Sequence, residues 1–372
     1  MKFPLNITGN IKDSKKKRES KRVLHVYLER HSVDYALVRY AGEEAHAELS
    51  FSVEHDQISI FDMNVLPESV LALQQHVSTS LVGDSKGKDP VLIDQINVSL
   101  SPVFITSETA EVIRITESPQ TLTSFETDLD MSGSIIHREI RDVALNGYEV
   151  SPRDAIGLVA ETVSFREEVH AIDQKTFEMI TSVFQKTMPG VVLNFSSSLA
   201  ESTYVIERML SPQDTWQLLH IDHDDSFLYI RDSSQTTSIR YGIDELFSQL
   251  VANNIGYDER AVLTSLRMAL REHLETDVLD RLSYTLDIES SVMNDALLDA
   301  GLSLELPLYL HSPHDVVSDL LEVRFKNAFA LERQYSEAGY PQEYLDVPPH
   351  VRLSMHHIAS IEFLLINEHS SL

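Results

Sequence analysis

The stretch KRVLHVYLERHSVDYALVRY, residues 21–40, contains two apolar runs separated by a short polar break. Residues 23–28 and 33–40 alternate between apolar and polar side chains and are enriched in β-branched types, a pattern typical of half-buried strands. The break between the two runs is short enough for a tight turn. The stretch therefore predicts a β-hairpin, and the remaining elements are arranged around it.

The hairpin is followed by a third strand and a helix, and then by a small mixed unit. A third strand is expected at residues 47–53, and residues 67–81 carry apolar side chains at helical spacing behind a first-turn proline. Strands are then expected at residues 96–100 and 112–115. Asn146-Gly147 lies between apolar runs, a strong signal for a hairpin turn. Residues 96–170 therefore predict an α+β unit.

The second half of the sequence repeats the opening plan. The patterns predict a helix at 173–187, a strand at 191–195, a helix at 198–209 and three strands at 217–221, 227–231 and 236–241. After a helix that begins near Asp244, one long amphipathic helix is expected over residues 258–282. A strand at 306–310, a helix at 316–329 and a last helix or strand pair ending at residue 366 complete the chain.

Composition limits the class of protein. The chain has 372 residues, of which 42% are hydrophobic, enough for two packed cores. Thirty basic against 58 acidic residues give a formal charge of -28, which repels nucleic acid. The absence of cysteine excludes disulfides, thiolate zinc sites and a cysteine nucleophile, and it fits a cytoplasmic protein.

The two ends of the sequence also carry expectations. Residues 1–20 include a basic run at 15–18 and predict a disordered tail, with weak contact to anionic lipid as an alternative. No stretch approaches the roughly 18 apolar residues of a membrane helix. Residues 355–366 lack the basic face of a membrane-targeting helix and are expected to pack on the core. His356 and His357 are adjacent and are expected to be a surface pair.

Two copies of a strand-hairpin-then-helix plan, with an α+β insertion in the first, resemble the actin-like ATPase superfamily in its FtsA/PilM-like branch. Residues 21–38 are similar to the family's first phosphate hairpin. Residues 135–148, with Arg138-Glu139-Ile140 and Leu145-Asn146-Gly147-Tyr148, resemble the small inserted domain of FtsA-type proteins. Ser198-Leu199-Ala200 resembles the segment before the second phosphate hairpin.

The resemblance implies an α/β, two-lobed actin-like (ribonuclease H-like) fold. The domains expected from it are a tail at 1–20, a first lobe at 21–95, an inserted domain at 96–170, a second lobe at 171–335 that includes a helical subdomain at 250–300, and a C-terminal segment at 336–372 that packs back on the core.

Members of this family hold a triphosphate between two glycine-containing turns, and a carboxylate positions magnesium through water. In the first turn of this chain, Tyr27 occupies the aspartate position, and Glu29 and Arg30 replace the Gly-Thr pair. In the second turn, His220 replaces the aspartate, while Asp222 and His223 replace the two glycines.

Ser226 lies near the threonine position of the second turn, and Gly242 retains one member of a third, glycine-pair element. His311-Ser312-Pro313 takes the place of the adenine-side turn. The degenerate nucleotide-binding set implied by the resemblance is thus Glu29, Arg30, Asp222, Ser226 and Gly242.

Side chains at glycine positions crowd a phosphate turn and disfavour positive φ. Asp222, Asp224 and Asp225 would also repel a triphosphate, unless magnesium bridges them. We therefore expect no catalytic residue and no cofactor, with weak binding of ATP and magnesium as the alternative. His220 and Asp222 are the weak candidates for a metal site, but a solvated turn explains them better.

The resemblance implies a non-catalytic scaffold or adaptor in bacterial cell division, a pseudo-ATPase working through protein partners in the cytoplasm at the inner face of the membrane. A PilM-like role in type IV pilus assembly is one alternative. Slow ATP hydrolysis through Glu29 or Asp222, and a metal-dependent enzyme built on residues 220–226, are others. Homo-oligomers are compatible with this reading.

Overall fold

The computed structural model describes residues 20–30, 32–42, 44–54, 66, 70–72, 93–125, 131–211, 214–339, 344–348 and 351–370. A six-stranded sheet with the order β15-β3-β2-β1-β4-β9 forms the first lobe. Its strands are β1 (Lys21–Leu28), β2 (Ser32–Ala41), β3 (Glu44–Glu54), β4 (Gln95–Leu100), β9 (Val192–Ser197) and β15 (Leu345–Asp346). The predicted hairpin is confirmed, because β1 and β2 pair antiparallel from Lys21↔Tyr40 to Leu28↔Val33.

Both faces of this sheet are covered. Apolar residues of β1, β2 and β4 pack with Ile180 and Phe184 of α3 (Gln174–Thr187), which begins at the N-cap Asp173. On the other face, Ile361 and Leu365 of α11 (Met355–Ser370) join a second cluster. β1 is therefore covered on both faces, and its residues 23–28 are all buried, including the polar His25.

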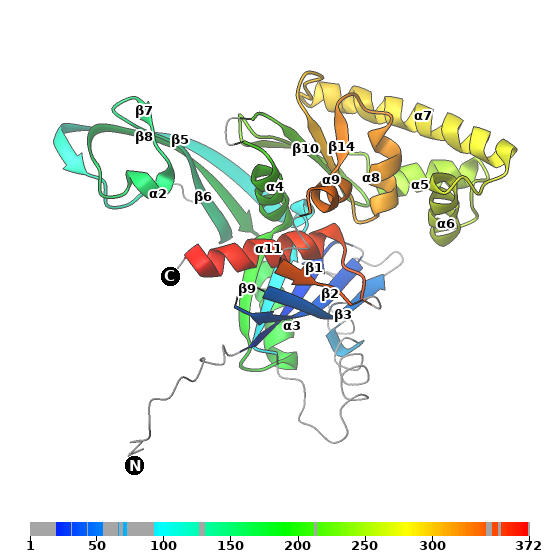
Figure 1. Cartoon of the computed structure of the whole chain (residues 1–372), viewed down its shortest axis with the longest axis horizontal. Coiled ribbons are helices and arrows are strands. Elements are labelled where there is room, and N and C mark those ends of the chain that lie inside the picture. The colour runs from blue at the N-terminus through cyan, green and yellow to red at the C-terminus, as the bar shows by residue number, and fades with distance from the viewer. Residues whose placement is uncertain are drawn as a thin grey trace, which may run out of the picture.

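The inserted domain is a four-stranded sheet that projects from the body of the molecule (Figure 1). It consists of β5 (Ile105–Thr121), β6 (Ser134–Leu145), β7 (Tyr148–Glu149), the short helix α2 (Pro152–Ala155) and β8 (Val159–Ile172), in the order β5-β8-β6-β7. Asn146 and Gly147 both have positive φ, 52° and 82°, as a type I′ turn requires. The predicted Asn-Gly hairpin is therefore confirmed.

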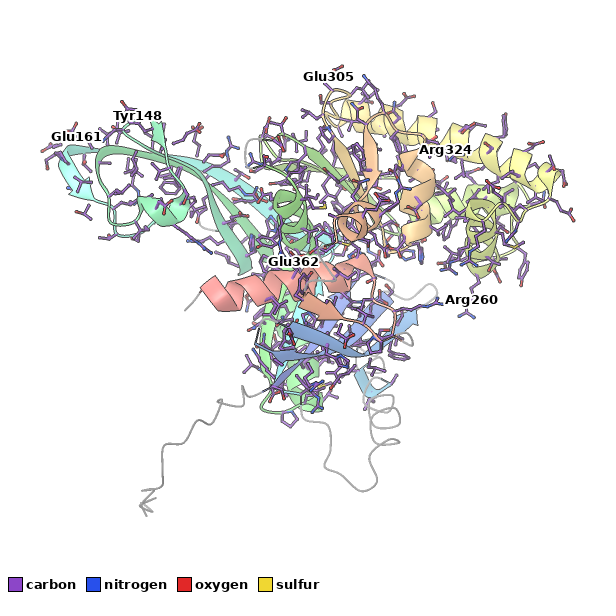
Figure 2. All side chains as sticks on the ribbon, viewed as in Figure 1. Tyr148, Glu161, Arg260, Glu305, Arg324 and Glu362 are labelled. Atoms are coloured by element: carbon purple, nitrogen blue, oxygen red, sulfur yellow. The ribbon has the colours of Figure 1, made fainter. Side chains whose placement is uncertain are left out.

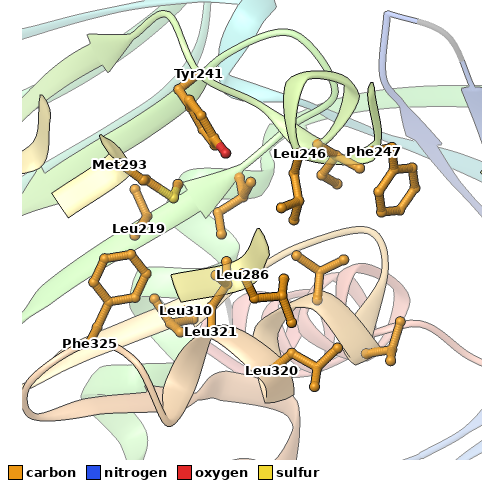
Figure 3. Packing of buried hydrophobic residues seen from close by; sticks show 14 of the residues in the cluster. Leu219, Tyr241, Leu246, Phe247, Leu286, Met293, Leu310, Leu320, Leu321 and Phe325 are labelled. Carbon is orange, nitrogen blue, oxygen red and sulfur yellow. The ribbon is translucent and has the colours of Figure 1, made fainter. Parts of the chain in front are cut away.

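The second lobe repeats the hairpin in a sheet of order β12-β11-β10-β13-β14. Its elements are α4 (Ser198–Met209), β10 (Gln217–Ile221), β11 (Ser226–Ile230), β12 (Gln235–Ile239), α5 (Ile243–Ala252), α6 (Glu259–Leu270), α7 (Thr276–Asp299), β13 (Leu308–His311), α8 (Asp315–Glu322), β14 (Ala328–Ala330) and α9 (Leu331–Glu337). Figure 3 shows its main core, in which Leu219 of β10 and Leu310 of β13 pack with Leu286 of α7 and Leu321 of α8.

Two expected domain boundaries are wrong. The predicted insertion includes β4, but β4 pairs in parallel with β1, from Val23↔Gln95 to Leu28↔Leu100. The predicted second lobe includes α3 and β9, but β9 pairs with β4 and α3 packs in the core of the first lobe. The chain returns to the first sheet on both sides of the insertion, so the inserted sheet itself runs only from residue 105 to residue 172.

Two predicted helices are shorter than expected. The helix expected over 258–282 breaks after Leu270, because Glu272 adopts a left-handed φ of 57° and a new helix starts at Thr276. The helix expected over 316–329 ends at Glu322, because Ala328–Ala330 pairs with β13 as an edge strand. The predicted tail before residue 20 and most of the predicted helix at 67–81 lie outside the described residues.

α11 runs across the middle of the molecule, between the first lobe and the second (Figure 1). Glu362 marks its course in Figure 2, where Arg260 and Glu305 lie at the periphery. Arg208 of α4 donates a hydrogen bond to Glu362. No helix among the described residues is long and apolar enough to span a bilayer.

Candidate functional site between the lobes

The two predicted phosphate turns face each other where the lobes meet. One follows β1 and the other follows β10, each in the interior of its sheet. Arg30 of the first turn forms an ion pair with Asp224 of the second. Glu29 Oε2 lies 3.6 Å from His223 Nε2. The side chains that replaced the expected glycines therefore connect the turns directly.

An aromatic stack lies behind the turns. The rings of Tyr27, on β1, and His356, on α11, are stacked with centroids 3.8 Å apart and planes 10° apart. Tyr27 Oη lies 3.4 Å from His220 Nε2 and 3.5 Å from Asp222 Oδ1. Tyr27 therefore touches both the second turn and α11 from the position where the family resemblance places an aspartate.

Asp222 is held by polar contacts inside the junction. The Ser101 hydroxyl donates to one carboxylate oxygen, and His220 Nε2 lies 3.0 Å from the other. Burial opposes ionisation, but His220 and these hydrogen bonds lower the pKa of Asp222 below its usual value. The interpretation of His220 and Asp222 as a solvated turn is wrong, because the two residues are only 0% and 3% exposed.

Three imidazole rings meet beside this carboxylate. His220, His311 and His356 have ring centroids between 4.1 and 5.6 Å apart. Burial, followed by repulsion from neighbouring imidazoles, lowers the pKa of His311 and of His356 well below the ordinary value. These two rings are therefore neutral at neutral pH, so they can pack against each other without charge repulsion.

The expectation of a surface pair at His356 and His357 is also wrong. Their exposed fractions are 1% and 4%. Adjacent residues do point apart on a helix, but α11 lies between two packed bodies, so both directions lead into protein. His357 Nδ1 lies 3.1 Å from the Ser354 hydroxyl.

His223 is a second cationic group of the junction, beside Arg30. Burial alone would lower its pKa, but Glu29 and Asp244 outweigh burial and raise it to about 10. His223 Nδ1 lies 2.9 Å from Asp244 Oδ1. Burial raises the pKa of Glu29, although His223 acts in the opposite direction. The positive charge that could attract a phosphate is thus already engaged by carboxyl groups.

The backbone of the second turn is engaged as well. At the start of α5, the N–H groups of Ile243 and Asp244 donate to the carbonyls of Asp222 and His223, each at 2.9 Å. A Cβ on Gly242 would lie 2.1 Å from the His223 carbonyl oxygen. Gly242 is therefore required for close packing of α5 on the turn, and these two donors of the helix N-terminus bind protein oxygens.

Ser226, the last predicted site residue, donates its hydroxyl hydrogen to the Tyr241 carbonyl at 2.6 Å. The structure thus brings the five predicted nucleotide-site residues to one region, and each makes contacts with other parts of the protein. Among the described residues, no set of three or more His, Asp or Glu side chains is arranged as metal ligands. His220 and Asp222 contact each other.

Sequence reasoning missed Glu201, a buried acid beside the junction. Its carboxylate accepts hydrogen bonds of 2.6 Å from Ser99 of β4 and from Ser196 of β9. Burial, partly offset by the serine hydroxyls, raises its pKa to about 7. Glu201 lies in the first turn of α4 and Ser196 is only five residues before it, but Ser99 is 102 residues away in the sequence.

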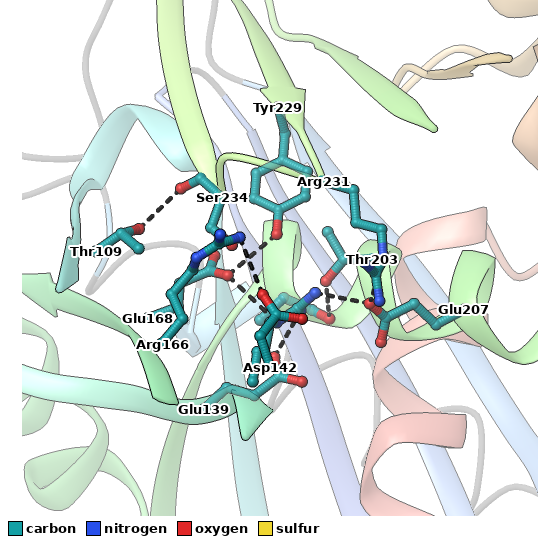
Figure 4. A network of polar contacts seen from close by, with 12 residues as sticks. Thr109, Glu139, Asp142, Arg166, Glu168, Thr203, Glu207, Tyr229, Arg231 and Ser234 are labelled. Atoms are coloured by element: carbon teal, nitrogen blue, oxygen red, sulfur yellow. Dashed lines mark hydrogen bonds and ion pairs between the residues drawn. The ribbon is translucent and has the colours of Figure 1, made fainter. Parts of the chain in front are cut away.

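A second polar network, drawn in Figure 4, joins the inserted domain to the second lobe. Arg141 of β6 contacts Glu207 of α4 at 2.6 Å, Glu139 at 2.7 Å and Glu168 of β8 at 3.5 Å. Tyr229 of β11 donates to Glu168 at 3.1 Å. The projecting sheet is thereby fixed to the second lobe through a nearly buried arginine.

No protein-family model and no curated protein matches the chain. Among solved structures, the PilM-PilN type IV pilus biogenesis complex aligns with a TM-score of 0.50 and 12% identity over 92% of this chain and 96% of that chain. The ethanolamine utilization protein EutJ from Carboxydothermus hydrogenoformans aligns with a TM-score of 0.43 and 10% identity over 92% of this chain and 89% of that chain. A Bacteroides thetaiotaomicron protein with an actin-like ATPase fold and unknown function aligns with a TM-score of 0.34 and 10% identity over 96% of this chain and 99% of that chain.

The sheet order, the two facing turns and the alignment over nearly the whole chain define a protein of the actin-like ATPase fold. Within that fold, the chain is similar to PilM. The predicted two-lobed fold class is confirmed.

Proposed function

We propose that this protein is a non-hydrolysing adaptor of actin-like fold, whose lobes are held together by its own side chains in place of a nucleotide. The stack of Tyr27 on His356 carries the proposal, because it fills the space behind the two turns with protein. The contacts of Arg30 with Asp224 and of Glu29 with His223 join the two turns directly.

A triphosphate would have to displace several interactions at once. It would break the Arg30–Asp224 pair, and it would compete with protein carbonyls for the N–H groups of Ile243 and Asp244. It would also meet the buried Asp222 carboxylate. Loss of the exposed ion pair costs about 0.2–1 kcal/mol and loss of each backbone hydrogen bond about 1 kcal/mol, and every 1.4 kcal/mol weakens binding about tenfold.

ATP binding is the direct test of the closed junction. Thermal shift and calorimetry with the full chain, with and without magnesium, are expected to show no saturable binding up to about 5 mM ATP. Saturable, magnesium-dependent binding would overturn the proposal. It would favour the alternative of a slow ATPase, in which Asp222 exchanges its bond from Ser101 for a metal-bound water.

For the partner, we favour assembly of a type IV pilus-like machine over cell division, since the PilM-PilN complex shares the fold over 92% of this chain. Location in the cytoplasm, at the inner face of the membrane, belongs to the same proposal. A PilN-type protein from the same genome is the partner to test. Calorimetry with its purified cytoplasmic segment is expected to show binding that does not require ATP, whereas failure to bind would count against pilus assembly.

A further inference from the structure

A cavity of about 280 Å³ lies at the carboxyl ends of the parallel strands β13 and β14. α8 and α9 supply its walls, and Met355, the first residue of α11, also lines it. His311, Ser312 and Ser318, which are buried, contribute polar groups. Ligands of open α/β sheets commonly bind outside the carboxyl ends of the strands.

The walls of the cavity are acidic. Asp315 and Asp319 of α8 and Glu332 of α9 line it. Among the described lining residues, Arg333 is the one basic side chain, and it is engaged by Glu322 and, at 3.8 Å, by Asp319. The cavity therefore favours a cation.

Two buried polar atoms of the lining residues have no hydrogen-bond partner, Glu332 Oε2 and His311 Nε2. His311 is only 2% exposed, and its other ring nitrogen lies 2.8 Å from the Ser202 hydroxyl. Burial, a hydrogen bond with Asp315 and the charges of Asp315 and Asp319 raise the pKa of Glu332 to about 10. Without a ligand, Glu332 thus holds a proton beside a carboxylate, and a buried acceptor is left unsatisfied.

We propose that this cavity binds a small aliphatic amine or diamine, whose ammonium group is received by Asp315 and Glu332. An ammonium group has three donors and a compact charge, which suit two carboxyl groups on facing helices. A divalent metal ion is a poorer fit, because the described acids are not gathered into a metal-ligand set. When the cation enters, the proton on Glu332 leaves to solvent, and the carboxylate formed pairs with the ammonium.

The test is calorimetry of the full chain with 1,4-diaminobutane at neutral pH, in two buffers of different ionisation enthalpy. We expect saturable binding with release of about one proton per ligand. The uncharged analogue 1,4-butanediol, of similar length, should give no binding. Glu332→Gln copies the neutral shape of the protonated acid, so it should fold with an unchanged Tm and weaken diamine binding by about tenfold or more.

Glu337→Gln is the matched control, since this acid lies exposed on the same helix, and it should bind the diamine as the parent does. Asp315→Asn is a second variant for the case that Glu332→Gln fails to fold. Equal affinity in the folded cavity variant and the parent, equal binding of the diol, or no saturable heat up to about 10 mM diamine would overturn the proposal. The adaptor proposal would survive such a result, because it rests on whether ATP binds, which the diamine titration does not measure.

Discussion

The ring of Tyr27, near the end of the first strand, is stacked on the ring of His356, near the start of the last helix, 3.8 Å away. This contact links the first strand to the last helix across the junction of the lobes. It also makes α11 part of the site, although the helix lies more than 300 residues from the first turn in sequence.

Replacing His356 with alanine should destabilise the fold by about 1–3 kcal/mol, because it removes a buried stack and leaves a cavity between the lobes. Urea unfolding measures the change. His273→Ala, at an exposed histidine in the break between α6 and α7, is the matched control and should cost less than about 0.5 kcal/mol. An equal cost in both variants would mean that the stack contributes nothing specific.

Gly242→Ala should be strongly destabilising, by about 2 kcal/mol or more, because its Cβ would meet the His223 carbonyl oxygen and the Asp224 backbone at 2.1 and 2.6 Å. Gly147→Ala is the comparison. There a Cβ meets nothing within 4 Å, and the expected cost is about 1 kcal/mol from positive φ alone. Thermal denaturation measures the loss of stability in the two variants. A smaller loss in Gly242→Ala than in Gly147→Ala would refute close packing of α5 on the turn.

The Arg30–Asp224 ion pair should contribute little to stability. Its side chains are 40% and 36% exposed, so solvent and salt screen the attraction. A double-mutant cycle with Arg30→Ala and Asp224→Ala is expected to give a coupling energy of about 0.2–1 kcal/mol that falls when salt is added. Coupling above about 2 kcal/mol, insensitive to salt, would show that the pair is far better shielded than its exposure indicates.

Arg141→Met should destabilise the protein by about 3–5 kcal/mol, because Glu139, Glu168 and Glu207 would lose their shared cation. Hydrogen exchange should rise most in β6 and β8, where the inserted sheet is fixed to the second lobe. Arg260→Met, at an exposed arginine of α6, is the control and should leave exchange in those strands unchanged. Unaltered protection in the Arg141 variant would contradict the role of this network.

Three buried histidines should lower stability as the pH drops below about 6.5, against an opposing gain from acids with raised pKa values such as Glu201 and Glu332. Burial lowers the pKa of His25 to about 3 and lowers those of His311 and His356 well below 6.5. The unfolded chain therefore takes up protons near pH 6.5 while the folded chain does not. Each such histidine costs up to about 1.4 kcal/mol per pH unit until its folded pKa is reached. Urea unfolding of the parent and of His356→Ala between about pH 6.5 and 5 isolates one histidine, because the difference in free energy of unfolding between the two proteins should shrink as the pH falls. A difference that stays constant over this range would show that the His356 ring is accessible to protons.

The sequence determined the periodic features of this protein. The hairpin at residues 21–40, its repeat at 217–231 and the Asn146-Gly147 turn were predictable because alternation and turn chemistry are local properties. The loss of glycine from both phosphate turns was readable in the same way, since it requires only the identity of the residues. Domain boundaries were not, because strand pairing such as β1 with β4 joins segments more than 60 residues apart.

Only the tertiary structure decided which polar side chains are buried. His220, Asp222, His356 and His357 are polar in any sequence reading, and they became interior residues because α11 is enclosed between two packed lobes. Burial and pairing depend on neighbours that are distant in the chain, and they set the charge states of His223, Glu332 and Glu201. The sequence alone therefore identified the residues of the two turns, whereas only the fold determined that their side chains are buried between the lobes.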